Sequence, residues 1–299
     1  MASISDELKR FISTANTLTK LIVINVVVFV IVQIIMTIYS LYRSEIMFEP
    51  ILQLFMVPSW THTLIRQPWS IFTYMFLHQD IMHILFNMLW FYVFGKIFLE
   101  YRGGKKLTTV YILGGISGAI LYVLAFNIFP AFQNIVEGSH ALGASASIMA
   151  IVVATAVMVP DYPLNLILLG RIPLKYIAIF SVILDVINIR SGNAGGHIAH
   201  LGGVIFGGIY MWQFKSGVDI GKWFENLVQS VANLLKPKPR MRTAYNANKR
   251  RPISDEEFVS SKKAFQEEID RILDKIAKSG YDSLTKDEKD KLFRASGKK

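Results

Sequence analysis

Hydrophobic residues fall into six long runs within the first 214 positions, and polar stretches separate the runs. The runs cover about residues 20–42, 80–100, 107–127, 141–159, 172–189 and 195–214. A helix needs about 20 mostly apolar residues to cross a bilayer. The first run holds 19 residues without a charge, from Leu21 to Tyr39, and helices of soluble proteins rarely lack a polar face in this way. The pattern predicts an all-α membrane protein with six transmembrane helices.

The character of the chain changes after residue 214. The stretch from Lys215 to Lys299 holds 20 of the 32 Lys and Arg residues and 13 of the 22 Asp and Glu residues. This change in composition predicts four parts. They are a cytoplasmic N-terminus at 1–19, a six-helix membrane domain at 20–214, an amphipathic juxtamembrane helix with a basic linker at 215–252, and a small cytoplasmic helical hairpin at 253–299.

The basic residues also predict an orientation. Lys and Arg favour the cytoplasmic side of a membrane. If the N-terminus lies inside, the loops between the runs place only Arg43, Arg66 and Arg190 outside, and the basic tail falls inside. We therefore expect both termini in the cytoplasm.

In this orientation the second, fourth and sixth helices all begin at the outer surface. Their first turns carry His83 and Asn87, then Ser145, then His200. Polar side chains inside a bilayer are costly and usually functional. Because these residues lie at one depth, they predict a single water-accessible site.

The residue types suggest acyl-transfer chemistry at that site. Ser145 lies near a helix N-terminus, where backbone N–H groups lack helical partners. A serine hydroxyl becomes a nucleophile when a neighbouring base takes its proton. Gly203 and Gly207 form a GxxxG pair, which allows close helix approach and would bring His200 to Ser145. Packing alone remains the alternative reading of the serine and of the histidine.

His83 and Asn87 are four residues apart and so share one helix face. Both can donate hydrogen bonds to developing negative charge, as an oxyanion hole requires. The alternatives are a packing role or a metal site. The chain has no HExxH motif and few acidic residues at this depth, so we expect no metal and no other cofactor. The absence of cysteine excludes a thiolate nucleophile.

Four segments together resemble the rhomboid family of intramembrane serine proteases. They are WSIFTYMFLH at 69–78, HILFN at 83–87, GASA at 143–146 and AHLGGVIFG at 199–207. The resemblance implies a catalytic dyad of Ser145 and His200 without a third, acidic member. It also implies an oxyanion hole of His83, Asn87 and the Ser145 backbone N–H. The family cleaves transmembrane segments of membrane proteins near the outer surface, and we expect a location in a bacterial inner membrane.

Two other functions fit parts of the pattern. A catalytically inactive rhomboid-like protein that binds transmembrane clients is the main alternative, because Ala146 stands where the family usually has glycine. A transporter would show two related halves with charges at the midplane, and the sequence shows no such repeat. Asp185 lies inside the fifth run, and we interpret it as a hydrogen-bonded or protonated packing residue near the outer end.

The tail combines an apolar helix face with basic residues. Residues 221–235 place Trp223, Leu227 and Val231 on one side of a helix, and seven Lys and Arg residues follow between 236 and 251. This combination is typical of a helix lying on an anionic lipid surface; nucleic acid could use the same charge, but we do not expect it. Capping-box patterns at 254–257 and 285–288 begin the two helices of the hairpin.

The expected topology can be tested by protease protection. Protease added to intact cells should leave the tail after Lys215 uncut, because the tail lies in the cytoplasm, and permeabilised cells serve as the control. Cleavage of the tail in intact cells would contradict the orientation and with it the argument that the polar residues share one depth.

Overall fold

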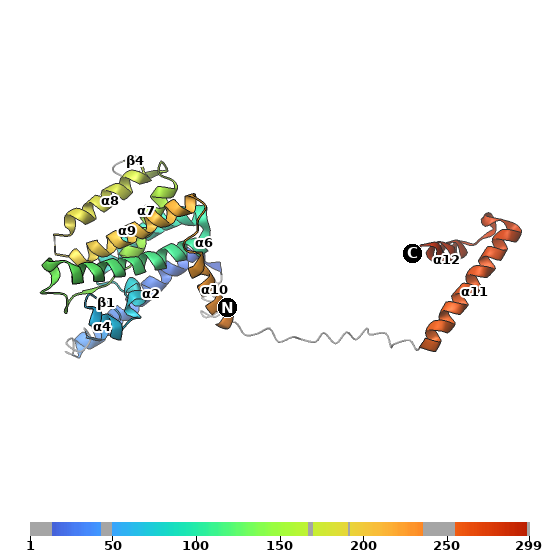
Figure 1. Cartoon of the computed structure of the whole chain (residues 1–299), viewed down its shortest axis with the longest axis horizontal. Helices are drawn as coiled ribbons and strands as arrows, with labels where there is room; N and C mark the ends of the chain where they lie inside the picture. The colour runs from blue at the N-terminus through green and yellow to red at the C-terminus, as the bar shows by residue number, and fades with distance from the viewer. Residues whose placement is uncertain (1–13, 43–49, 167–169, 191, 236–254, 298–299) are drawn as a thin grey trace. The chain divides into compact units, whose positions relative to one another are not determined.

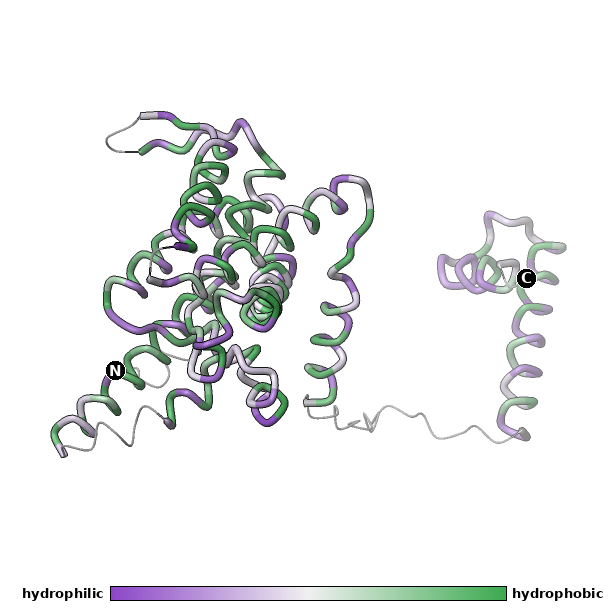
Figure 2. Tube along the Cα trace, turned by 60° about the vertical axis from the view of Figure 1, so that its left-hand side comes forward, coloured by the Kyte–Doolittle hydropathy of each residue, from purple (hydrophilic) through white to green (hydrophobic). Residues whose placement is uncertain are grey.

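The structure is a computed structural model that describes residues 14–42, 50–166, 170–190, 192–235 and 255–297. The chain forms two compact units, residues 1–236 and 237–299 (Figure 1). The division falls inside the stretch at 215–252 that was expected to be a juxtamembrane helix and linker. In Figure 2 hydrophobic residues dominate the helices of the first unit, whereas the first helix of the second unit alternates hydrophobic and hydrophilic residues.

The first unit is mostly helical. Its longer helices are α2 (Thr17–Leu41), α6 (Ile81–Ile128), α7 (Ser145–Met158), α8 (Leu174–Asn188), α9 (Ala194–Lys215) and α10 (Lys222–Leu235). Between α2 and α7 lie the short elements β1 (Val57–Pro58), α4 (Thr61–Arg66), α5 (Ser70–Thr73), η1 (Tyr74–Phe76), η2 (Pro130–Phe132) and β2 (His140–Ala141). The two strands pair antiparallel, and so do β3 (Pro163–Leu166) and β4 (Gly170–Pro173) before α8.

A glycine divides α6 into two helical halves. Gly103 has φ +76°, a left-handed conformation that costs little only in glycine. At 1.5 Å per residue each half is about 33–38 Å long, which matches the thickness of a bilayer. The halves correspond to the second and third hydrophobic runs.

Among the described residues, two helices, α2 and α6, are long and apolar enough to cross a membrane, and α7 is apolar but shorter. A mostly helical fold is therefore confirmed, and the number of six spanning helices stays a prediction.

The central helix α7 packs against α6, α8 and α9 (Figure 1). Gly203 and Gly207 of α9 lie against the backbone carbonyl groups of Ala146 and Ala150, so that a methyl group at either glycine would collide with α7. This confirms the close approach that the GxxxG pair predicted between the fourth and sixth runs.

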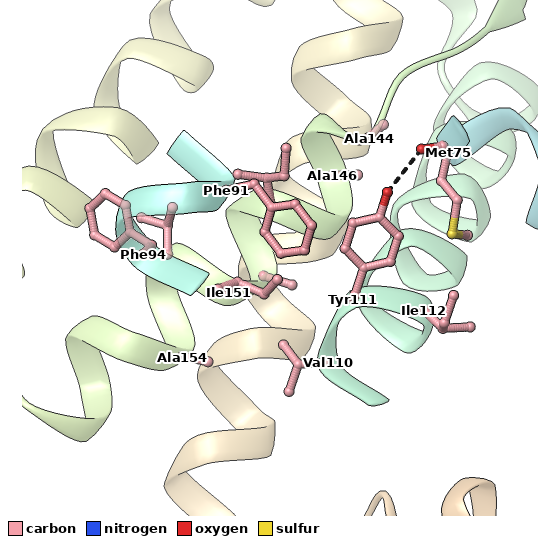
Figure 3. Packing of buried hydrophobic residues seen from close by; sticks show 14 of the residues in the cluster. Met75, Phe91, Phe94, Val110, Tyr111, Ile112, Ala144, Ala146, Ile151 and Ala154 are labelled. Carbon is pink, nitrogen blue, oxygen red and sulfur yellow. Dashed lines mark hydrogen bonds between the residues drawn. The ribbon is translucent and has the colours of Figure 1, made fainter. Parts of the chain in front are cut away.

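Aromatic side chains fill the space on another side of α7. The rings of Phe91 and Tyr111 stack with centroids 5.1 Å apart, and they lie beside Ala146 and Ile151 in the buried core (Figure 3). The rings thus close the core around the first turns of α7.

Buried hydrogen bonds connect the segment before α6 to the helices. The Tyr74 hydroxyl donates to the Gly115 carbonyl at 2.6 Å, and the Tyr111 hydroxyl contacts the Met75 carbonyl at 3.2 Å (Figure 3). The Gly143 N–H donates to the Tyr74 carbonyl at 2.9 Å. Because Gly143 stands just before α7, these bonds fix the position where α7 begins.

The stretch expected to form a juxtamembrane helix contains the helix α10, and its place beside a membrane stays a prediction. Lys106 of α6 forms ion pairs with Asp219 and with Glu225, the latter at 2.7 Å. On α10 the apolar side chains Trp223 and Leu227 are exposed. The helix is thus held at one end by charge, and its contact with anionic lipid stays a prediction.

The second unit contains α11 (Asp255–Ser279), η3 (Tyr281–Ser283) and α12 (Lys286–Ser296). Its small core consists of Ile269, Ile272 and Leu284. The capping box at Thr285 and Glu288 is confirmed, whereas the one expected at Ser254 begins outside the described residues. The Thr285 backbone N–H donates a hydrogen bond to the Glu288 carboxylate and lowers its pKa to about 2. A hydrogen bond from Lys275 contributes a smaller part of the same shift.

The α7–α9 contact predicts opposite outcomes for two adjacent glycines. Gly207→Ala places a methyl group against the Ala150 carbonyl, whereas a methyl group at Gly208 meets only a Val153 methyl at 3.6 Å. Overpacking of this kind costs about 1–3 kcal/mol. Thermal unfolding of purified protein should show a lower melting temperature for Gly207→Ala and little change for Gly208→Ala. Equal effects would contradict the contact.

Candidate active site

A cavity of about 810 Å³ lies where α6, α7 and α9 begin. Its wall includes His83 and Asn87 from α6, Ser145 from α7 and His200 from α9. The structure thus brings together in one cavity the four side chains that the sequence analysis selected. They come from segments up to 117 positions apart, so only the helix packing described above can bring them together.

Ser145 is the first residue of α7. Gly143 lies two residues before Ser145, and its φ of +128° and its close neighbours both favour glycine. A Cβ at residue 143 would lie 3.0 Å from His83 Nε2 and 3.5 Å from Ser145 Oγ. The serine hydroxyl and the His83 ring therefore approach each other across a position without a side chain. Ser147, by contrast, is fully buried, with its hydroxyl 3.9 Å from Met75 Sδ.

Hydrogen bonding defines which nitrogen of His83 carries a proton. The Gln79 backbone N–H donates to His83 Nδ1 at 3.4 Å. Since a neutral imidazole has one donor and one acceptor nitrogen, Nε2 is the donor. Asp80 caps the N-terminus of α6, and its carboxylate accepts from the His83 backbone N–H at 2.8 Å. His83 Nε2–H is therefore a fixed donor next to Ser145.

Asn87 offers a second donor. Its Nδ2 is buried and has no hydrogen-bond partner among the described residues, although the residue borders the cavity. A buried donor without a partner costs about 1–3 kcal/mol. A bound group that accepts from this N–H would remove that cost.

His200 is held by a carboxylate from another helix. Its Nδ1 lies 2.8 Å from Asp185 Oδ1, and His197 Nδ1 lies 2.9 Å from the same oxygen. Asp185 belongs to α8 and is buried. No hydrogen bond joins Ser145 to His200 in the described part of the chain. Bonds between a nucleophile and its base are often long before substrate binds.

The Asp185 pairing was missed by the sequence analysis, which interpreted this residue as packing. Asp185 is 12 residues before His197 and 15 before His200, on a different helix, so helical spacing does not predict these contacts. The pairing arises because α8 packs against α9. The ligand atoms of Asp185, His197 and His200 lie within 4.8 Å of one another, so this trio has donors of the kind that bind metals. The absence of a metal, expected from the lack of an HExxH motif, stays a prediction.

Comparison with known families gives the class of the protein. Residues 65–216, half of the chain, match the Rhomboid domain. The chain belongs to the rhomboid family, and it is a membrane protein. Residues 254–298 match a second family, described as a family of unknown function (DUF6576).

Two curated relatives are similar to this chain. RHOMBOID-like protein 12, mitochondrial, from Arabidopsis thaliana is 28% identical over 165 residues, which are 52% of this chain and 47% of that protein. Presenilin-associated rhomboid-like protein A, mitochondrial, from Danio rerio is 29% identical over 153 residues, 48% of this chain and 36% of that protein. The chain thus matches less than half the length of each. Both names refer to mitochondria, so they give no support to the expected bacterial membrane.

Proposed function

We propose that this chain is an intramembrane serine endopeptidase that cleaves transmembrane segments of other membrane proteins near the outer face. The observation that carries the proposal is the composition of the cavity wall. It combines a serine at a helix N-terminus, an imidazole whose Nδ1 is already bonded, and two hydrogen-bond donors. Membership in the rhomboid family supports the same function.

The proposed reaction begins with Ser145 and His200. As the Ser145 oxygen attacks the carbonyl carbon of the scissile peptide bond, its proton passes to His200 Nε2. The tetrahedral intermediate then collapses, the C–N bond breaks, and His200 returns the proton to the leaving amine. Water attacks the acyl-enzyme in the second half, with His200 taking its proton and Ser145 leaving as the alcohol.

The oxyanion would be stabilised by His83, Asn87 and the Ser145 backbone N–H. His83 has its proton on Nε2, because Nδ1 accepts from Gln79, and the Asn87 Nδ2 has no hydrogen-bond partner among the described residues. A helix N-terminus adds unpaired N–H groups and a favourable dipole. Donors fixed in place before the reaction are effective because they need no reorganisation when charge develops.

The proposed membrane arrangement has six spanning helices and both ends in the cytoplasm. The two halves of α6 count as two spans, and α2, α7, α8 and α9 supply the others. In this arrangement the cavity lies near the outer surface, where water can enter. We propose that residues 215–252 contact anionic lipid through α10 and the basic residues that follow, and that residues 253–299 form a cytoplasmic helical hairpin.

The roles of Ser145 and His200 predict the outcome of three substitutions. Ser145→Ala and His200→Ala should each lower cleavage of a reporter transmembrane segment by at least about 10⁴-fold, because removing one member of a catalytic unit costs nearly as much as removing both. Ser147→Ala is the matched control, since that hydroxyl is buried away from the cavity, and should keep most of the activity.

A fluorophosphonate probe provides the second measurement. It should label the wild-type protein and Ser147→Ala but not Ser145→Ala. If the wild-type protein neither cleaves the reporter nor reacts with the probe, the proposed activity is contradicted, and the catalytically inactive binder of transmembrane clients becomes the favoured function.

The proposed oxyanion hole predicts a separate effect of Asn87→Ala. Losing one such donor typically costs about 100- to 1,000-fold in turnover. The loss should appear in kcat with little change in KM, since the bond forms mainly in the transition state. A packing role would instead lower the melting temperature and leave the activity per folded molecule unchanged. Both quantities should be measured on one purified sample.

A further inference from the structure

Asp185 is the feature of the site that the proposed dyad does not use. Its side chain is 9% exposed, and it lies inside α8 among apolar residues. A buried carboxylate is costly unless it is paired or fully hydrogen-bonded. Here its partners are the two histidines that α9 presents three residues apart, on one helix face. The only cavity residue among these partners is His200.

The shared oxygen limits which protonation patterns fit the trio. Both imidazoles contact the same atom, Asp185 Oδ1, through Nδ1, at 2.8 and 2.9 Å. A carboxylate oxygen can accept two N–H donors, whereas a carboxylic O–H could donate to only one of the rings. The two contacts at Asp185 Oδ1 fit an ionised carboxylate that accepts an Nδ1–H from each of the two rings.

This pattern has a direct consequence for the base. A neutral His200 with its proton on Nδ1 has a lone pair on Nε2. That nitrogen is the one that must accept the Ser145 proton. Without a partner at Nδ1, an imidazole divides its population between two tautomers and can rotate about its side-chain bonds. The carboxylate removes both freedoms.

We infer that Asp185 is a positioning residue for His200, and that His197 helps to hold the Asp185 carboxylate in place through the same oxygen. The inference rests on the proposed function and adds Asp185 behind the Ser145–His200 dyad as the residue that holds the base. When His200 takes the serine proton on Nε2, the imidazolium keeps its Nδ1 proton, and Asp185 stays ionised throughout. The negative charge stabilises the imidazolium, and no proton moves to the carboxylate.

The test compares substitutions at Asp185 in the full-length protein in lipid nanodiscs. The rate of Ser145 labelling by a fluorophosphonate probe is measured together with the melting temperature. Asp185→Asn should slow labelling by at least about 100-fold, because the amide no longer selects one tautomer; the matching change in a Ser-His-Asp protease costs about 10⁴-fold. Asp185→Glu should recover part of the rate. His197→Gln should lose less, since His200 keeps its own bond.

Ser181→Ala is the matched control on α8. It removes only a hydrogen bond within the helix, to the Ile177 carbonyl, and should label at the wild-type rate. A structural role of Asp185 is tested separately by ¹⁵N NMR of the His200 ring. The wild-type ring should carry its proton on Nδ1, and Asp185→Asn should show a mixture of tautomers, even where both proteins melt at the same temperature.

Three results would overturn the inference. The first is labelling of Asp185→Asn at the wild-type rate per folded molecule. The second is an unchanged His200 tautomer in that variant. The third is loss of wild-type labelling in a chelator with recovery in zinc, which would make the trio a metal site. Probe labelling that survives in Ser145→Ala would instead contradict the proposed function, so the two failures can be told apart.

Discussion

The backbone of α7 lies directly against the backbone of α9, because Gly203 and Gly207 present no side chain to the carbonyl groups of Ala146 and Ala150. Ser145 precedes Ala146 by one residue, and His200 precedes Gly203 by three. The contact that joins the helices therefore also fixes the spacing between hydroxyl and imidazole. The Ala146 methyl also faces Gly118 of α6. An alanine at the position where the family usually has glycine is thus accommodated by a glycine on the neighbouring helix.

The apolar core makes each polar link strong and specific. Burying a polar group without a partner costs several kcal/mol in such surroundings, so each hydrogen bond formed between buried groups holds its two segments together. Asn25 of α2 donates to the Tyr111 hydroxyl at 3.0 Å, and Tyr111 in turn contacts the Met75 carbonyl. Tyr74 connects Gly115 of α6 with Gly143, which lies two residues before α7. Together these bonds hold three helices and the segment 74–75 as one frame around the cavity.

The sequence predicted those features that leave a local or periodic signal. The helices follow from hydrophobic runs, and the α7–α9 contact follows from the spacing of Gly203 and Gly207. Short segments with polar residues at helix starts were enough to select four residues of the cavity wall, His83, Asn87, Ser145 and His200. The break at Gly103 in α6 agrees with the polar gap between two runs. These signals are readable because each depends on residues within a few positions of one another.

Other features depend on tertiary contacts and could not be predicted. The partners of Asp185 lie 12 and 15 residues away on a different helix, so only the packing of α8 on α9 brings them together. The proton on His83 Nε2 depends on a backbone N–H of the preceding loop, at Gln79, that no side-chain pattern announces. The ion pair between Lys106 and Glu225 joins residues 119 positions apart. In each case the residue was visible in the sequence and its partner was not.

The two imidazoles at the cavity differ in their hydrogen bonding at Nε2, where one is a donor and the other an acceptor. His83 presents an N–H at Nε2, because Nδ1 accepts from Gln79; His200 presents a lone pair at Nε2, because its Nδ1 faces Asp185. Hydrogen bonding therefore favours one orientation of a molecule that bridges the two rings. A small molecule that both donates and accepts, such as water, can bind with its oxygen toward His83 and one hydrogen toward His200. The reversed orientation would set donor against donor and acceptor against acceptor.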